Sequence, residues 1–287
     1  MMDSPLHHPL PPYGTLLGAW RTGAAHRRRQ QPCQDAALWQ WQETATGTHL
    51  LLAVADGHGG SHYDRSEQGA RLAVVEGLRL LSEWLQAFSH PSQLLNSWRS
   101  DFARFLQRRW RAAVLQHHAQ QANEEEPAAE NPHDPEDPTA IVRRYGATLL
   151  VVLVQADRIY AGQIGDGKLL RIPQGGPPCE PLPADPALLG SETHSLCSEA
   201  VDKLWQSATW QRQDDETLLF CTDGLSDSFA GPEEFYRFAE SLPLLLQERG
   251  SETIARHLPE WLDRYSEEGS GDDMTLLLLH PTLDAGV

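Results

Sequence analysis

The sequence predicts an α+β protein in which antiparallel strands form layers and helices come in antiparallel pairs. Short apolar runs typical of buried strands alternate with longer segments of helical periodicity. Two of these runs are separated only by Gln155-Ala156-Asp157, which indicates a β-hairpin. The elements do not follow the strict βαβ alternation that would predict a parallel sheet, so we expect antiparallel layers.

The N-terminal part combines a polar tail with the first core elements. Residues 1–13 are rich in Pro and His and are predicted to be a disordered tail, so order should begin near Gly14. Residues 49–55 form a fully apolar run typical of a buried strand. Apolar residues at helical spacing then predict a helix over 64–88 and a second helix that begins near Ser92.

The middle of the chain contains an abrupt change of composition. Residues 122–139 are rich in Glu, Asp and Pro and hold no large apolar side chain, which predicts a flexible surface loop. We expect this loop to lie within a single domain that spans residues 14–287. Beyond it, strands are predicted at 148–154, 158–164, 168–172, 217–221 and 274–279, and helices from Pro232 and over 251–265.

Charge and composition exclude several classes of protein. With 40 acidic and 23 basic side chains the formal charge is −17, which argues against nucleic acid or an anionic membrane as the main partner. No apolar run is long enough to span a bilayer, and the N-terminus lacks the apolar region of a signal peptide. Four Cys without regular spacing indicate a reducing compartment. We therefore expect a cytoplasmic protein that is a monomer.

Acidic residues recur at the ends of the predicted strands. Three strands end in Asp-Gly and a fourth acidic pair precedes the last strand: Asp56-Gly57, Asp166-Gly167, Asp223-Gly224 and Asp272-Asp273. Asp is a poor strand residue, and a buried unpaired carboxylate is costly. Carboxylates that converge on one sheet edge need a cation, and hard oxygen ligands favour magnesium or manganese over zinc.

Two simpler interpretations compete with a metal site. Asp-Gly is the commonest hairpin turn dipeptide, so any single occurrence is expected to be only a turn. Three occurrences favour a site, and the segment 56–60 is longer than a tight turn requires, with glycines that allow close approach to a ligand. Residues 162–169 approach a phosphate-binding P-loop, but Leu169 stands where Ser or Thr is needed, which excludes nucleotide binding there.

Five segments, taken in order, resemble the metal-dependent protein phosphatases of type 2C. They are Asp56-Gly57-His58-Gly59-Gly60, Gly146-Ala147-Thr148, Ile164-Gly165-Asp166-Gly167, Thr222-Asp223-Gly224-Leu225-Ser226-Asp227 and Asp272-Asp273-Met274-Thr275. The stretches Gly23-Ala24-Ala25-His26 and Pro32-Cys33-Gln34-Asp35-Ala36 resemble the bacterial branch. The resemblance covers residues 14–282 and implies two packed antiparallel sheets flanked by helix pairs, with metals in a cleft at one end.

The resemblance also implies roles for individual residues. The two-metal centre, occupied by Mn²⁺ or Mg²⁺, would be held by Asp35, Asp56, Asp223 and Asp272 with the Gly57 carbonyl. Asp166 matches an acidic residue that binds a third ion in some members. His58 matches the proposed general acid, beside the catalytic carboxylates Asp56 and Asp35.

The phosphate-binding residue is the main departure from the family pattern. The family places an Arg five residues before the first metal-site Asp, and this chain has Gln30 there. One of the adjacent arginines, Arg29 or Arg27, is therefore predicted to bind phosphate in a shifted register. Gln34 stands where the family often has Glu, which would alter a contact to metal-bound water.

The implied activity is that of a Ser/Thr protein phosphatase. Hydroxide bridging two metal ions would attack the phosphomonoester directly while His58 protonates the leaving alkoxide. The partners would be a phosphorylated protein and a cognate Ser/Thr kinase that the phosphatase opposes. Two alternatives remain open: a catalytically weak pseudophosphatase that binds a phosphoprotein or a partner kinase, motivated by Gln30, and a module whose cations are structural.

Overall fold

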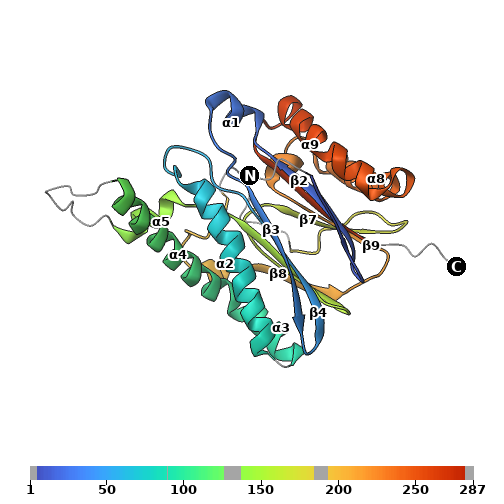
Figure 1. Ribbon diagram of the computed structural model, residues 1–287, viewed down its shortest axis with the longest axis horizontal. Coiled ribbons are helices and arrows are strands. Elements are labelled where there is room, and N and C mark those ends of the chain that lie inside the picture. The colour runs from blue at the N-terminus through green and yellow to red at the C-terminus, as the bar shows by residue number, and fades with distance from the viewer. Residues whose placement is uncertain (1–4, 89, 126–136, 184–192, 282–287) are drawn as a thin grey trace.

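The computed structural model describes residues 5–88, 90–125, 137–183 and 193–281. Two five-stranded sheets pack face to face, and helices cover both outer faces (Figure 1). Neighbouring strands in both sheets are antiparallel. The predicted fold class, an α+β sandwich of antiparallel sheets flanked by helix pairs, is confirmed.

Each sheet combines strands from distant parts of the chain. The first has the order β1 (Leu6–Leu10), β2 (Gly14–Arg21), β10 (Met274–His280), β9 (Glu216–Cys221) and β7 (Lys168–Pro173). The second has the order β3 (Ala36–Thr44), β4 (Gly47–Ala55), β5 (Leu149–Val154), β6 (Arg158–Ile164) and β8 (Gln206–Gln211). The predicted hairpin is present as β5 and β6.

The long helices cover the sheets in two groups. The second sheet carries α2 (Ser66–Ala87), α3 (Pro91–Ser100) and α4 (Phe102–Glu125), and the first carries α8 (Pro232–Arg249) and α9 (Ser251–Glu268) (Figure 1). Shorter helices lie in the connections: α1 (Ala24–Arg29), α5 (Pro138–Arg144), α6 (Val201–Leu204) and α7 (Asp223–Ser226). None of the described helices combines the length and apolarity needed to cross a membrane.

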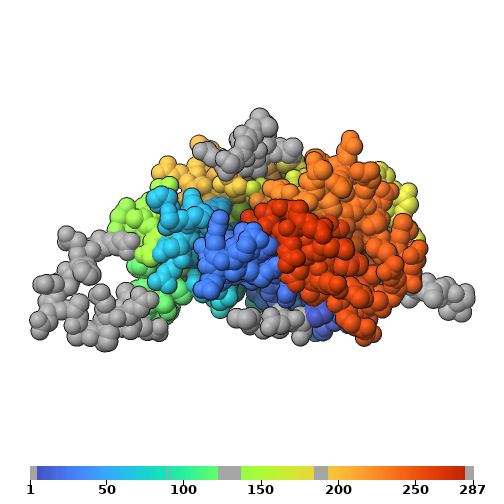
Figure 2. Space-filling view, turned by 90° about the horizontal axis from the view of Figure 1, so that it is seen from above, coloured from blue at the N-terminus to red at the C-terminus, as the bar shows by residue number. Residues whose placement is uncertain are grey.

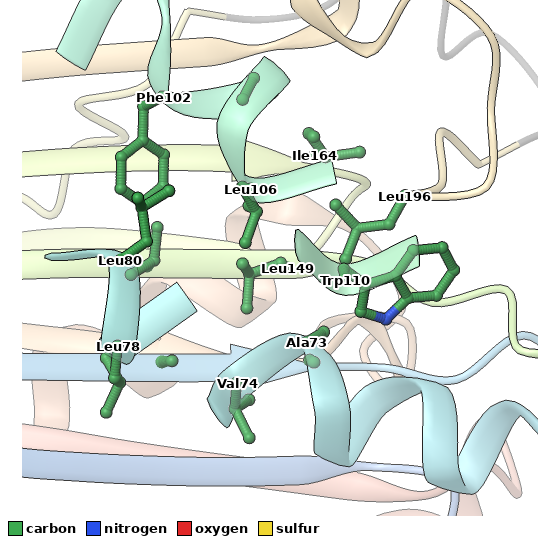
Figure 3. Close-up of a cluster of buried hydrophobic side chains, with 14 of the residues drawn as sticks. Ala73, Val74, Leu78, Leu80, Phe102, Leu106, Trp110, Leu149, Ile164 and Leu196 are labelled. Atoms are coloured by element: carbon green, nitrogen blue, oxygen red, sulfur yellow. The ribbon is translucent and has the colours of Figure 1, made fainter. Parts of the chain in front are cut away.

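Three apolar layers hold the sandwich together, one between the sheets and one under each group of helices. Figure 3 shows part of the layer under α2 and α4, where Leu106 packs above Leu149 of β5 and Trp110 lies near Leu196 and Ala73. The Trp110 indole is fully buried, and its N–H donates to the Gly69 carbonyl at 3.0 Å. A buried indole N–H needs an acceptor, and here the acceptor lies on α2, so this hydrogen bond holds α4 against α2.

The prediction that residues 1–13 form a disordered tail is partly wrong. Residues 6–10 form the edge strand β1, which pairs with β2 in the register Leu10↔Gly14. Leu10 and Tyr13 are each 3% exposed and pack between the sheets. Their burial orders a segment whose Pro- and His-rich composition predicts disorder. Pro9 is compatible with this position because an edge strand leaves one side of its backbone unpaired.

Two further segments differ from the expectation. The predicted second helix is divided at Asp101, and just before it the Ser100 hydroxyl donates to the Asn96 carbonyl at 3.0 Å, a side-chain bond that competes with the helical backbone. In the predicted loop at 122–139, α4 continues to Glu125 and α5 begins at Pro138, while residues 126–136 lie outside the described residues. The polar strand β8, which lacks an apolar run, was not predicted.

Candidate metal centre

Asp35 and Asp56 flank two paired strands of the second sheet. Ala36, the first residue of β3, pairs with Ala55, the last residue of β4. Asp35 directly precedes this pair and Asp56 directly follows it, so antiparallel pairing places both at one end of the sheet.

The facing sheet contributes Asp223 and Asp272 at the same end of the sandwich. Cys221, the last residue of β9, pairs with Leu276 of β10, so the segment after β9 meets the segment before β10. The first residue of β7 also pairs with Cys221, which brings Asp166, just before β7, to this end. The negative charges of Asp166 and Asp272 both act on Asp223, which shows that these carboxylates converge.

The Asp35 carboxylate joins the two sheets. Its Oδ2 accepts hydrogen bonds from the hydroxyls of Thr222 at 2.8 Å and Thr275 at 2.7 Å. Asp35 is 6% exposed, and its Oδ1 has no hydrogen-bond partner within the described part of the chain. Since a buried carboxylate oxygen without a donor is costly, this atom needs a cation or a proton.

The carboxyl groups of Asp56 and Asp223 are hydrogen-bonded to each other. Burial raises the pKa of Asp56 well above its usual value, and the charges of Asp35 and Asp223 raise it further. Burial also raises the pKa of Asp223 to about 6, although the hydrogen bond from Asp56 opposes this shift. Asp223 Oδ1 lacks a partner among residues whose structure is described. The two carboxyl groups of such a pair are both ionised only when a cation lies beside them.

The backbone at Asp56-Gly57 is fixed from both sides. The Asp56 N–H donates to the Thr148 hydroxyl at 2.9 Å, and the Gly57 N–H donates to the Gln34 carbonyl at 3.1 Å. A Cβ at Gly57 would lie only 2.6 Å from the Ser66 carbonyl oxygen. Only glycine therefore fits between β4 and the start of α2, where its own carbonyl is the predicted ligand.

Two further carboxylates lie beside this cluster. Asp166 accepts a hydrogen bond from the Thr193 hydroxyl. Asp227 lies one turn after Asp223, with its N–H donating to the Asp223 carbonyl at 2.8 Å, and burial and the charge of Asp166 raise its pKa. The sequence reasoning assigned no role to Asp227, although the i, i+4 spacing from Asp223 was the available signal.

Asp272 and Asp273, grouped together from the sequence, have different environments. Asp272 is exposed, whereas Asp273 is 2% exposed and its carboxylate points to the region around α1. Asp273 accepts hydrogen bonds from the Gly23 N–H at 2.6 Å, the Gln34 N–H at 2.6 Å and His26 Nδ1 at 2.9 Å. Asp273 therefore anchors the chain on both sides of α1, leaving Asp272 for the centre.

His58 follows the metal-site loop directly. Its imidazole is partly buried and packs edge-on against Tyr63 with 5.0 Å between ring centroids, and the main-chain N–H of His58 donates to the Gly146 carbonyl at 3.0 Å. Burial lowers the pKa of His58, and the charge of Asp166 opposes this shift. A lowered pKa favours the neutral imidazole, so the role of His58 as an acid stays a prediction.

A cleft of about 480 Å³ lies between the α1 region and the loop after Gly57, and its lining includes His26, Arg29, Gln34 and Tyr63 but none of the predicted metal-site Asp side chains. Figure 2 looks down on this face, where α1 (blue) lies between the start of α2 (cyan) and α9 (red). Arg27 has a different place, because its guanidinium pairs with Asp263 at 3.0 Å and Glu267 at 3.1 Å on α9. Of the two predicted phosphate-binding arginines, only Arg29 lines the cleft.

Comparison with known proteins identifies the family. The Protein phosphatase 2C profile matches residues 22–263. The chain belongs to this family. The match confirms the resemblance inferred from the sequence and includes Asp35, Asp56, Asp166 and Asp223, while Asp272 lies beyond its end. No curated protein matches the sequence significantly.

Solved structures of bacterial phosphatases have the same fold. A bacterial serine phosphatase is 17% identical with a TM-score of 0.60, covering 94% of this chain and 99% of that chain. The catalytic domain of the Ser/Thr phosphatase PstP, in complex with two manganese ions, is 19% identical with a TM-score of 0.52, covering 92% and 96%. PppA of Pseudomonas aeruginosa, described as a key regulatory component of its T6SS, is 17% identical with a TM-score of 0.54, covering 92% and 95%.

Proposed function

We propose that this member of the type 2C family is a metal-dependent Ser/Thr protein phosphatase. The convergence of acidic side chains from both sheets at one end of the sandwich carries the proposal, since Asp35 and Asp223 each have a buried carboxylate oxygen without a donor in the described structure. Family membership supports phosphate-ester hydrolysis as the chemistry. The two manganese ions in PstP show that a protein of this fold binds such cations.

The donor set fits hard divalent cations. Carboxylates of Asp35, Asp56, Asp223 and Asp272 and the Gly57 carbonyl would hold two Mn²⁺ or Mg²⁺ ions, and Asp166 would serve a third. When bound, the pair supplies a nucleophilic water of lowered pKa and neutralises charge on the phosphoryl oxygens. No side-chain nucleophile is then required.

The other residues bind the substrate and move a proton. Arg29 on the cleft wall would donate hydrogen bonds to the phosphoryl oxygens, a role suited to its planar guanidinium. His58 would give a proton to the departing Ser or Thr oxygen. Asp35, held by two threonine hydroxyls from the facing sheet, would keep the two halves of the centre in register.

The substrate would be a phosphorylated protein, and the partner a Ser/Thr kinase whose action this enzyme reverses. PppA, described as a regulatory component, supports a role in signalling for a protein of this fold. The monomeric state and the cytoplasmic location remain predictions from the sequence.

Hydrolysis of a phosphothreonine peptide tests the proposal. The full chain should hydrolyse it with Mn²⁺ and not with EDTA. Asp223→Ala should lower kcat by more than about 100-fold, because a direct ligand contributes more than the roughly 10–100-fold of residues behind the ligands. Asp214→Ala, at a carboxylate 89% exposed and paired with Arg212, is the matched control and should retain full activity.

The outcomes separate the alternative functions. A loss of less than about tenfold in Asp223→Ala would contradict the metal role. Mn²⁺ binding with no turnover of any phosphopeptide would indicate the pseudophosphatase. Metal-dependent melting that phosphate analogues leave unchanged would indicate structural cations.

A further inference from the structure

His26 lies between two adjacent carboxylates. Its Nδ1 is 2.9 Å from Asp273 Oδ2, and its Nε2 is 4.0 Å from Asp272 Oδ1. Asp273 also accepts two main-chain N–H groups, those of Gly23 and Gln34, so its carboxylate acts as an acceptor on both oxygens. The hydrogen-bond pattern therefore assigns a proton to Nδ1 and directs Nε2 toward Asp272.

The imidazole is built into the wall of the centre and is not a surface side chain. His26 is 8% exposed, and the part of it that is exposed faces the cleft lined by Arg29. Within the described ranges, the ligand atoms of His26, Asp272 and Asp273 form a group whose members all lie within 4.8 Å of one another. Asp273 is already engaged by three donors, so Nε2 and the Asp272 carboxylate, whose Oδ1 accepts the Asp273 N–H at 2.8 Å, are the groups available to a cation.

Close backbone packing fixes α1 in this position. A Cβ at Gly23 would lie 2.3 Å from the Asp272 carbonyl carbon, so the start of the helix lies directly against the acidic segment. The Ala25 N–H donates to the Gly271 carbonyl at 2.8 Å, and the Ser266 hydroxyl donates to the Asp272 carbonyl at 2.9 Å. The orientation of His26 toward Asp272 is therefore imposed by the main chain.

A histidine that binds metal through one ring nitrogen almost always donates its other N–H to a carboxylate or carbonyl. The contacts of His26 reproduce this arrangement. We propose that His26 Nε2 is a nitrogen ligand of the cation held by Asp272, and that Asp273 orients the imidazole from behind. The inference rests on the proposed function, because Asp272 belongs to the metal centre assigned there.

A nitrogen ligand changes which cation the centre prefers. Imidazole suits later first-row ions such as Fe²⁺, Ni²⁺ and Zn²⁺ best, whereas carboxylates, carbonyls and water suit both Mg²⁺ and Mn²⁺. Of the two ions that the sequence left open, Mn²⁺ is the transition metal and accepts a nitrogen ligand more readily than Mg²⁺. His26→Gln should therefore weaken Mn²⁺ binding selectively.

Calorimetric titration of the full chain with Mn²⁺ and with Mg²⁺ measures this selectivity. In His26→Gln the Kd for Mn²⁺ should rise at least about tenfold while that for Mg²⁺ changes less than about threefold. Asp273→Asn keeps an oxygen acceptor for Nδ1 and should raise the Kd for Mn²⁺ less. His62→Gln, at an exposed histidine, should change neither. An equal loss for both ions would assign His26 a purely structural role and overturn the proposal.

Pulsed EPR of the Mn²⁺-loaded protein with ¹⁵N-labelled histidine tests the bond directly. Nitrogen hyperfine coupling should be present in the wild type, His58→Gln and His62→Gln and absent in His26→Gln. Mn²⁺ binding without coupling in the wild type, or loss of coupling in His58→Gln alone, would overturn the assignment and leave the proposed function intact. A wild type that binds no Mn²⁺ would refute both. The wild-type and His58→Gln spectra decide the matter even if His26→Gln fails to fold.

Discussion

Asp56 and Asp223 follow strands of different sheets, β4 and β9, and their carboxyl groups are hydrogen-bonded to each other. The pair lies where the two sheets meet, with Asp35 and Asp272 adding further negative charge. Two ionised carboxylates in contact repel, so the closed end of the sandwich is stable only with a shared proton or a cation. The arrangement that binds metal therefore destabilises the metal-free fold.

Asp56→Asn should stabilise the metal-free protein. Replacing the Asp56 carboxyl group by an amide removes the repulsion of the ionised pair and gives Asp223 a donor that needs no shared proton, a change of about 1–3 kcal/mol. In EDTA the Tm should rise, at about 2–4 °C per kcal/mol for domains near this size. With excess Mn²⁺ the order should reverse, because only the wild type gains the full binding free energy. Calorimetric melting checks this, and a Tm below that of the wild type in EDTA would refute it.

Arg29→Ala should lower catalytic efficiency, whereas Arg27→Ala should lower only stability. Arg29 lines the cleft, so its loss should lower kcat/KM by about tenfold or more, since a hydrogen bond to a charged group contributes about 1.5–3 kcal/mol. Arg27 pairs with Asp263 and Glu267, so its loss should leave kcat/KM within about twofold and cost about 0.2–1 kcal/mol of stability. Steady-state kinetics with a phosphothreonine peptide measure both variants. If Arg27 were the phosphate-binding residue, Arg27→Ala would lower kcat/KM and Arg29→Ala would leave it unchanged.

Thr275→Val should destabilise the junction between the sheets. The variant keeps the shape of the side chain but removes a donor to the buried Asp35 carboxylate, which should lower the free energy of unfolding by about 1–3 kcal/mol. Thr209→Val is a matched control, because the buried Thr209 hydroxyl has no partner in the described structure. Urea denaturation in EDTA should show no loss for this control. Equal losses in both variants would mean that the Asp35 contact contributes nothing specific.

His280 should make stability depend on pH at the opposite end of the sandwich. Its Nδ1 lies 2.8 Å from the Thr217 hydroxyl, Asp215 and Glu240 line the same hollow, and burial lowers the pKa of His280. In the unfolded chain the pKa is about 6.5, so below that pH the unfolded state binds more protons than the folded state. The contribution of His280 is therefore present above about pH 6.5 and is lost as the pH falls toward the folded pKa.

His280→Gln should reduce this dependence. Between about pH 7 and pH 5 the free energy of unfolding should fall less steeply in the variant than in the wild type. Denaturation series at several pH values in EDTA measure the two slopes. Identical slopes would show that His280 titrates normally in the folded protein.

Local patterns predicted most of the fold correctly. Burial of one or both faces of an element leaves a direct trace in the sequence, namely an apolar run or an apolar periodicity. This trace predicted the strands β4, β5 and β9 and the helices α2 and α9. The edge strands β1 and β8 lack this trace, whereas the edge strand β7 has an apolar run and was predicted. In β1 and β8 burial depends on neighbours distant in the chain, and β8 pairs only with β6.

The chemistry of the site was predictable for the same reason. Asp56, Asp166 and Asp223 stand where apolar strands stop, and carboxylates in such places are unusual enough to indicate a cation before any contact is known. The sequence by itself thus predicted the type of donor, and its resemblance to the type 2C phosphatases predicted the class of reaction.

The tertiary structure decided which of two neighbouring side chains lies at the site and which makes structural contacts elsewhere. Arg27 and Arg29 are two positions apart on one short helix, and only the packing of α1 against α9 sends one to an ion pair and the other to the cleft. Asp272 and Asp273 are adjacent, and only the contacts around α1 bury the second and leave the first for the centre. Side-chain direction is set by elements distant in the chain, because burial and hydrogen bonding are properties of the assembled layers.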